Sequence, residues 1–422
     1  MPALGALIAE PLYILTDTAV VGHLGTDQLA GLAIASSVLL IGYSLFIFLA
    51  YGTTAAVARL LGAGDEERAA HQAVQGMWLA FVVGLVLVVL GQIFAVPMVE
   101  LLGATGAVRD YALVYLRISL VGVPATLIVL AGTGYLRGLQ DTTTPLVVAV
   151  VSALGNLVLE LVLIYGLGFG IGASAWATVV AQIGAATVYV VWVGRAVREH
   201  RVALGPHGPT LRRLAVVGGD LFVRTAALRG AFLVATAVAA RIGTVALAAH
   251  QIAFEIWSFL ALTLDAVAIA GQALIGRYLG ADDVASARRS GRRMIEWGVG
   301  AGIVLGMATL ALRTALPSVF TSDPSVVAVT AFVLVFVGVM QPVNGVVFVL
   351  DGLLIGAGDL RYLAGAMAVS FVAFLPCAVG VAVLGLGIGW LWTALFVFMV
   401  VRMVTLGLRW RRDGWAVTGA DR

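Results

Sequence analysis

The sequence predicts an all-α integral membrane protein, with twelve transmembrane helices in two pseudo-symmetric lobes of six helices each. Three observations support this prediction. First, hydrophobic residues make up 61% of the 422 residues and charged residues only 11%, whereas a soluble domain has roughly 25% charged residues. Second, apolar runs of about 20 residues, the length that crosses a bilayer, recur along the chain. Third, motifs of the first half return in the second half.

The apolar runs follow one another from one end of the chain to the other. Continuous runs of this length exclude a β-barrel, because the strands of a barrel alternate polar and apolar side chains. The 51 glycines fit closely packed helices, since small residues let membrane helices approach. In chain order, the expected spans are 3–22, 34–57, 74–97, 110–135, 144–166, 170–194, 214–240, 250–275, 294–314, 325–350, 361–383 and 386–408.

Arginines are distributed unequally between the two sides of these spans. One side carries clusters, such as those within 195–213 and 277–293. The few arginines of the opposite side are Arg109, Arg117, Arg241 and Arg313. The side richer in arginine is expected to face the cytoplasm. Both termini are therefore expected to be cytoplasmic, in a multi-pass protein of the plasma (inner) membrane.

The second half of the chain repeats the first at a constant offset of 218 residues (243 minus 25). LGAGD at 61–65 returns as LGADD at 279–283. The same offset relates Gly25 to Gly243, Arg59 to Arg277, Pro124 to Pro342, Gly134 to Gly352, Gly138 to Gly356 and Asp141 to Asp359. Two lobes of the same topology are expected, at 1–200 and 201–422. The seventh span begins near Leu214, which the offset maps to before Met1, so the first span is expected to be shorter at its cytoplasmic end.

Composition excludes several classes of function. All 25 basic residues are arginine, which excludes a P-loop lysine and a Schiff-base lysine. The single cysteine, Cys377, can form no internal disulfide. The five histidines lack metal-ligand spacing, so no metal centre and no organic cofactor are expected. The net charge of +3 lies in loops and marks membrane orientation, so no nucleic-acid partner is expected.

Asp17 lies near the middle of the first apolar span. A carboxylate in hydrocarbon is costly, and such residues usually face a bundle interior or a water-filled cavity where they have a function. Tyr13, four residues earlier, lies on the same helical face. Chains built from two such repeats commonly bind substrate near the membrane midplane and work by alternating access.

Two further pairs of polar residues lie on shared helical faces of the first half. Asn156 and Glu160 are four residues apart on the fifth span, and Thr178 and Gln182 are four residues apart on the sixth. Together with Asp17, the second carboxyl group is suited to hold a proton, or a Na⁺ with the Asn and Thr oxygens. The alternative is structural, because such side chains also form hydrogen bonds between membrane helices.

The repeat separates the two halves by function. Asp17 maps to Ala235, Asn156 to Phe374 and Glu160 to Ala378. The carboxyl set of the first half therefore has no copy in the second half, so ion coupling is expected in the first lobe.

The second half carries its own charges within the expected spans. Asp220 and Arg224 are four residues apart on the seventh span, a spacing that favours a structural pair. Asp265 and Asp351 are candidates either for the lining of a central cavity or for structural contacts between the lobes.

Several motifs together resemble one known family. They are AEPLYILTDTAVVGHLG, RLLGAGD, RGLQDTTTP, GNLVLELVLIYGLGFGIGASAWATVVAQ and FVLDGLLIGAGDLRY. The chain resembles the multidrug and toxic compound extrusion (MATE) family over nearly its whole length, and most of all the DinF-like subfamily. The resemblance implies a V-shaped, rocker-switch antiporter rather than an enzyme. It also implies export of organic compounds, often cationic or amphipathic, against inward H⁺ or Na⁺.

The resemblance also implies roles for individual residues. It places the helix-1 aspartate and tyrosine of the family at Asp17 and Tyr13, and the proline associated with bending at Pro2. It places the helix-5 asparagine at Asn156 and the helix-6 threonine at Thr178. No residue is expected to be catalytic, and the chain is expected to act as a monomer.

Two positions depart from the family pattern. Related members usually carry Asp at the helix-5 acid, whereas this chain carries Glu160. The longer side chain keeps the charge but moves it by about one methylene, which affects the geometry of Na⁺ coordination more than proton exchange and so favours H⁺. A Na⁺ held by Asp17, Asn156, Glu160 and Thr178 is the alternative. Asn344 stands at the helix-10 position where the NorM-type branch has an acid. The residues expected to line a cavity are Gln182, Asp265, Asp351 and Asn344.

Two other functions are weighed against antiport. A lipid-linked oligosaccharide flippase of a related fold would need a cationic central cavity, for which Arg224 and Arg229 are candidates. A membrane-embedded enzyme would need paired Asp residues, a Ser/His set or a metal-binding DxxD motif, and none of these patterns is found in the sequence.

Overall fold

The computed structural model describes residues 2–420, apart from the side chains of residues 9–12. Within this part the chain folds into helices and contains no strand, which confirms the all-α prediction. The helices are α1 (Pro2–Gly22), α2 (Thr26–Phe46), α3 (Phe48–Gly62), α4 (Glu66–Leu101), α5 (Gly106–Val121), α6 (Val123–Gly138), α7 (Thr143–Glu160), η1 (Leu161–Gly166), α8 (Ile171–His200), α9 (Gly208–Ile242), α10 (Thr244–Gly280), α11 (Val284–Leu312), η2 (Pro317–Val319), α12 (Pro324–Gly356), α13 (Leu360–Val383), α14 (Ile388–Arg411) and η3 (Asp413–Trp415).

The predicted spans correspond to membrane-length helical segments of the described chain. Eleven segments are long and apolar enough to cross a membrane, and the pair α5 and α6, bent by 48°, makes a twelfth when counted as one span. Helices α2 and α3 form one segment, Thr26–Gly62, and α7 with the π-helix η1 forms another, Thr143–Gly166. The twelve spans are thus confirmed in order.

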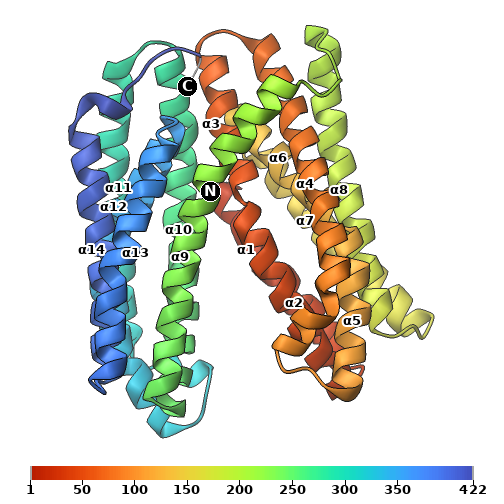
Figure 1. Ribbon diagram of the computed structural model, residues 1–422, viewed down its shortest axis with the longest axis vertical. Coiled ribbons are helices and arrows are strands. Elements are labelled where there is room, and N and C mark those ends of the chain that lie inside the picture. The colour runs from red at the N-terminus through yellow and green to blue at the C-terminus, as the bar shows by residue number, and fades with distance from the viewer. Residues whose placement is uncertain (1, 421–422) are drawn as a thin grey trace. The chain divides into compact units, whose positions relative to one another are not determined.

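Two compact units make up the chain, Met1–Gly218 and Gly219–Arg422 (Figure 1). In the first unit α3 packs against α6, α2 against α5, and α1 against α7. In the second unit α12 packs against α10, α11 and α14. The sequence-based border between the lobes, after residue 200, lies at the connection that precedes α9, and the border between the units lies within α9.

Both units have a glycine at which two helices pack closely, and these two glycines are related by the internal repeat. A Cβ atom added to Gly134 on α6 would collide with the backbone oxygen of Ala50 on α3. One added to Gly352 on α12 would collide with the backbone oxygen of Ala268 on α10. Both partners are related by the same offset of 218 residues (268 minus 50, and 352 minus 134). Each unit therefore uses a glycine at the same place to bring two helices into backbone contact.

Helix caps repeat at one pair of positions. Asp65 accepts a hydrogen bond from the backbone N–H of Arg68 at 3.0 Å, and Asp283 accepts one from that of Ser286 at 2.8 Å. These bonds satisfy N–H groups that a helix start leaves without a partner. Hydrogen bonds from Ser286 hold the pKa of Asp283 below its ordinary value.

A second pair of aspartates has diverged. Asp141 accepts hydrogen bonds from the backbone N–H groups of Thr143 and Thr144, both at 2.9 Å, at the start of α7. Its counterpart Asp359 instead accepts two bonds from the guanidinium of Arg409, at 2.6 and 3.2 Å. Asp141 therefore caps the start of α7, whereas the Asp359 side chain makes no capping hydrogen bond.

Candidate functional site

Asp17 lies on α1 and is 5% exposed. Tyr115 of α5 donates a hydrogen bond to Asp17 Oδ2 at 3.1 Å, and Ser174 of α8 donates one to Asp17 Oδ1 at 2.9 Å. Each carboxyl oxygen of Asp17 therefore has its own hydroxyl donor, from a different helix. Burial of a carboxyl group in an apolar bundle is tolerated when such partners are present.

Ser174 links Asp17 to the second carboxyl group. Its Oγ atom also contacts Glu160 Oε1 at hydrogen-bond distance. Both Ser174 and Glu160 are completely buried. Within the first unit, the hydroxyl group of Ser174 on α8 therefore joins the carboxyl group of Asp17 on α1 to that of Glu160 on α7.

Tyr13 and Thr178 form a second contact between α1 and α8. The Tyr13 hydroxyl donates to Thr178 Oγ1 at 2.8 Å. Tyr13 is one helical turn before Asp17, and Thr178 one turn after Ser174, so the two contacts lie side by side along the same helix pair. Asp17, Tyr13 and Thr178, three of the residues that the sequence singles out on these helices, thus belong to one polar cluster.

Two buried oxygen atoms at the site have no hydrogen-bond partner among the described residues. They are Asn156 Oδ1 and Glu160 Oε2, one turn apart on α7. A buried acceptor without a donor costs free energy, about 1–3 kcal/mol in typical proteins. Such atoms in a polar cluster point to a partner such as a proton, a water molecule or a cation.

The chain changes its helical form directly after Glu160. The six residues of η1 form a π-helix, a form that is rare and frequent at functional sites. Tyr165 in η1 donates to the backbone oxygen of Val20 on α1 at 3.1 Å. Ile164 packs with Val20 and Ala173 in a small apolar cluster. The segment that carries Glu160 is therefore fixed against α1 and α8 next to the polar cluster.

Two members of the cluster were not predicted from the sequence. Ser174 is four residues before Thr178, so helical spacing places both on one face of α8 and was the available signal. Tyr115 lies in an apolar stretch of α5, and no pattern distinguishes it from a tyrosine in an ordinary helix interface.

Other predicted site residues lie apart from these contacts. Gln182 is half-buried on α8 beside Gly122, the residue between α5 and α6, and its Oε1 has no partner in the described structure. Pro2 is the first described residue of α1, and its role as a hinge stays a prediction.

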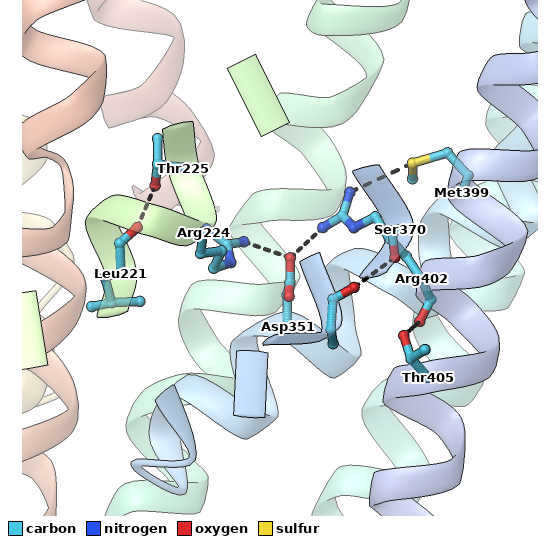
Figure 2. A network of polar contacts seen from close by, with 9 residues as sticks. Leu221, Arg224, Thr225, Asp351, Ser370, Met399, Arg402 and Thr405 are labelled. Carbon is cyan, nitrogen blue, oxygen red and sulfur yellow. Dashed lines mark hydrogen bonds and ion pairs between the residues drawn. The ribbon is translucent and has the colours of Figure 1, made fainter. Parts of the chain in front are cut away.

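The second unit holds a different polar cluster (Figure 2). Arg224 of α9 and Arg402 of α14 approach the same oxygen of Asp351 on α12, each at 2.5 Å. All three side chains are buried. Arg402 also lies over the ring of Phe398, with its guanidinium carbon 5.7 Å from the ring centroid. Asp351 is thus the centre of an ion cluster that connects three helices.

This cluster changes the interpretation of two sequence predictions. The expected pairing of Arg224 with Asp220, four residues earlier, gives way to a long-range ion pair with Asp351. Asp351, considered for a cavity lining or for a contact between the lobes, contacts two arginines of its own unit, and a role in lining a cavity stays a prediction. Asp265 is half-buried on α10, and Asn344 is buried on α12 with its Oδ1 lacking a partner in the described chain.

A comparison with known protein families matches the MatE family over residues 2–162 and 221–384, one stretch in each half of the chain. The chain belongs to the MatE family. The match confirms the resemblance seen in the motifs, and it identifies the chain as a multi-pass membrane transporter of the MATE, DinF-like type.

Individual relatives agree with this assignment. The chain is 34% identical to Protein DETOXIFICATION 44, chloroplastic, of Arabidopsis thaliana, over 96% of this chain and 79% of that protein. It is 28% identical to DNA damage-inducible protein F of Escherichia coli (strain K12), over 98% and 90%. The solved structure of a Vibrio cholerae MATE transporter in the bent form aligns with a TM-score of 0.87 at 21% identity, over 97% and 94%. The MATE fold of the chain is thereby confirmed.

Proposed function

We propose that this MATE transporter is a proton-coupled antiporter that exports small organic, cationic or amphipathic compounds across the plasma membrane by rocker-switch alternating access. The proton is held by Asp17 and Glu160 in the first unit. The observation that carries this proposal is the position of Ser174, whose single hydroxyl contacts both carboxyl groups.

The proton count of this contact supports H⁺ as the coupling ion. A serine hydroxyl has one hydrogen to donate, and here it faces two carboxyl oxygens. If both carboxyl groups were ionised, the Ser174 hydroxyl could donate its hydrogen to only one of them. Its oxygen would then face an oxygen of the other carboxylate with no hydrogen between the two. A proton on one carboxyl group supplies the missing hydrogen and removes one buried charge, which is costly inside a membrane bundle.

Electrostatics then couples proton binding to export. An organic cation is attracted to the site while a carboxylate is ionised. Uptake of a proton from outside neutralises that charge and weakens cation binding, so the cation leaves. Release of the proton to the cytoplasm restores the charge. Proton and substrate thus compete for the same negative charge, and each is carried in the opposite direction.

Sodium is the second candidate ion, and one observation favours it. The partnerless oxygens of Asn156 and Glu160 are ligands of the type that hard cations prefer. Thr178, the fourth expected ligand, accepts one hydrogen bond from Tyr13, and its hydroxyl oxygen has a second lone pair for a Na⁺. The contact of Ser174 with both carboxyl groups, which calls for a proton, favours H⁺.

The flippase alternative needs positive charge that is available to a pyrophosphate. Arg224, one of its two candidate residues, shares the carboxylate of Asp351 with Arg402. The ion cluster therefore reduces the charge that this arginine offers, and it supports the antiporter over the flippase.

The proposal is tested by ethidium export from proteoliposomes in which a pH gradient and a Na⁺ gradient are imposed separately. We expect the pH gradient alone to drive export by the wild type, and Asp17→Asn to abolish this dependence. Asp27→Asn, which removes an exposed acid at the start of α2, serves as the matched control and retains export. Full proton-driven export by Asp17→Asn, or export driven by Na⁺ alone, would contradict the proposal.

A further inference from the structure

Four arginines lie exposed on the first turns of α11, where they form one surface that we call the α11 arginine face (Arg288, Arg289, Arg292 and Arg293). The spacing i, i+1, i+4, i+5 puts all four on the same side of the helix. With Glu296 they line a cavity of about 300 Å³. The repeat offset maps the four arginines to Ala70, His71, Val74 and Gln75, so the first unit has no copy of this face.

The face keeps an excess of positive charge. Arg288 pairs with Asp413, and Arg293 pairs with Glu296 at 3.6 Å. The four arginines thus outnumber these two acidic partners. Like charges four residues apart on a helix destabilise it, and the face contains two such pairs. A surface that keeps this excess of positive charge is suited to an anionic ligand.

The segment that follows α14 holds this face in place. Trp415 is completely buried and stacks on Trp410, with ring centroids 4.2 Å apart. The guanidinium carbon of Arg288 lies 5.9 Å from the centre of the Trp415 ring. Gly291, in the middle of the face, has no side chain to displace Trp410, because a Cβ atom there would collide with that ring. The arginines are therefore carried on a braced helix end.

The exposed side of α11 changes in character along its length. Trp297, one turn after Arg293, is 67% exposed, and Ile303, Val304 and Met307 follow as exposed apolar side chains. Tryptophan is enriched at the level of lipid headgroups. The eleven residue-to-residue steps from Arg293 to Val304 span about 16 Å of helix at 1.5 Å per step, roughly half the thickness of the hydrocarbon core. Along α11, arginines come first, then a tryptophan, then aliphatic side chains. This order matches the order of groups in a lipid molecule, from the headgroup to the acyl chain.

We propose that the α11 arginine face binds the headgroup of an anionic phospholipid, whose acyl chains lie along the exposed apolar side of α11. Guanidinium groups bind phosphate oxygens with two parallel hydrogen bonds, which suits a fixed headgroup site. A soluble phosphate would use the arginines alone, whereas the exposed aliphatic stripe below them fits a lipid. This site is separate from the coupling cluster of the first unit.

Native mass spectrometry of the full-length protein, purified from nanodiscs of phosphatidylcholine alone or mixed with phosphatidylglycerol, tests the proposal. We expect the wild type to retain phosphatidylglycerol in preference. The Arg289→Gln, Arg292→Gln double variant leaves both acid-paired arginines in place and is expected to weaken this retention about 25-fold, since each arginine near an anionic surface contributes a factor of about five. Arg195→Gln with Arg198→Gln removes the same charge from the exposed end of α8 and is expected to change nothing.

Two further measurements separate loss of charge from loss of folding, and a lipid from a free phosphate. Arg289→Lys with Arg292→Lys keeps the charge and is expected to restore most of the preference, which separates loss of charge from loss of folding. Inorganic phosphate is expected to leave the bound lipid in place. Equal retention by the Gln double variant, equal loss in the α8 control, or displacement of the lipid by inorganic phosphate would each overturn the assignment of a lipid site.

Discussion

At the scale of single residues, two tyrosines of the polar cluster donate hydrogen bonds to different partners. Tyr115 donates to Asp17 itself, whereas Tyr13 donates to Thr178. A hydroxyl that donates to a carboxylate stabilises its ionised form. A tyrosine-to-phenylalanine change at either position removes one hydroxyl oxygen and keeps the ring, so each variant serves as a control for the other.

Tyr115→Phe removes the hydroxyl that donates to Asp17 Oδ2, and we expect the pH dependence of ethidium export to move to higher pH because the carboxylate loses a hydrogen bond. Tyr13→Phe is expected to leave the profile where it is. The pH profiles of the two variants and the wild type are compared by measuring export rates in proteoliposomes over a series of pH values. Equal profiles for Tyr115→Phe and the wild type would show that Asp17 does not set the pH dependence.

Some members of the cluster could be predicted from the sequence and others could not. A charge such as Asp17 or Glu160 inside an apolar run is conspicuous, because the surrounding hydrocarbon makes it expensive. Hydroxyl groups such as that of Ser174 are common in membrane helices, and only the folded arrangement shows which acid they contact. The structure brings these residues together, and their role in coupling stays a prediction.

At the scale of helices, the Asp351 cluster connects α9, α12 and α14 within the second unit. Breaking a buried ion cluster by removing one partner is strongly destabilising, because the remaining charges stay buried without compensation. Helical periodicity could not find this contact: Asp351 is 127 residues from Arg224 and 51 from Arg402, and short-range spacing favoured Asp220 as a partner.

Asp351→Asn is expected to destabilise the protein by about 3–5 kcal/mol, because two buried arginines lose their shared carboxylate. Asp110→Asn, which alters an exposed acid paired at 4.0 Å with Arg109, is expected to change stability by less than about 0.5 kcal/mol. Thermal unfolding of the purified proteins in detergent measures both. Equal midpoints for the two variants would contradict a structural role for the cluster.

Glycine positions give a second prediction at this scale. Gly352→Ala would place a methyl group against the backbone of Ala268 and force α12 away from α10, at a cost of about 1–3 kcal/mol. Gly365 on α13 is exposed and has open space around it, so Gly365→Ala is expected to be neutral or slightly stabilising. The same unfolding measurement compares them, and a neutral Gly352→Ala would show that the close approach is not required.

At the scale of the whole molecule, the two units share a plan and differ in their interiors. The repeat, the span order and the all-α class could be predicted from the sequence, because hydrophobic length and a constant offset determine them. The offset maps Ser174 to Trp392 and Tyr115 to Val333, so the second unit has an indole and an aliphatic side chain where the first has two hydroxyl donors. Trp392 lines a small apolar pocket with Trp257 and Phe398. Divergence of the interior on a conserved plan is consistent with coupling by the first unit alone.

In the proposed cycle, Asp17 and Glu160 together hold one proton that an organic cation displaces. This displacement is tested most directly by measuring proton release when ethidium is added to the purified, weakly buffered protein. We predict that the wild type releases about one proton per ethidium bound, as competition for one shared charge requires, and that Asp17→Asn and Glu160→Gln each release none while Asp27→Asn behaves as the wild type. Undiminished proton release from Asp17→Asn and Glu160→Gln, or ethidium binding by the wild type with no release of protons, would contradict the account.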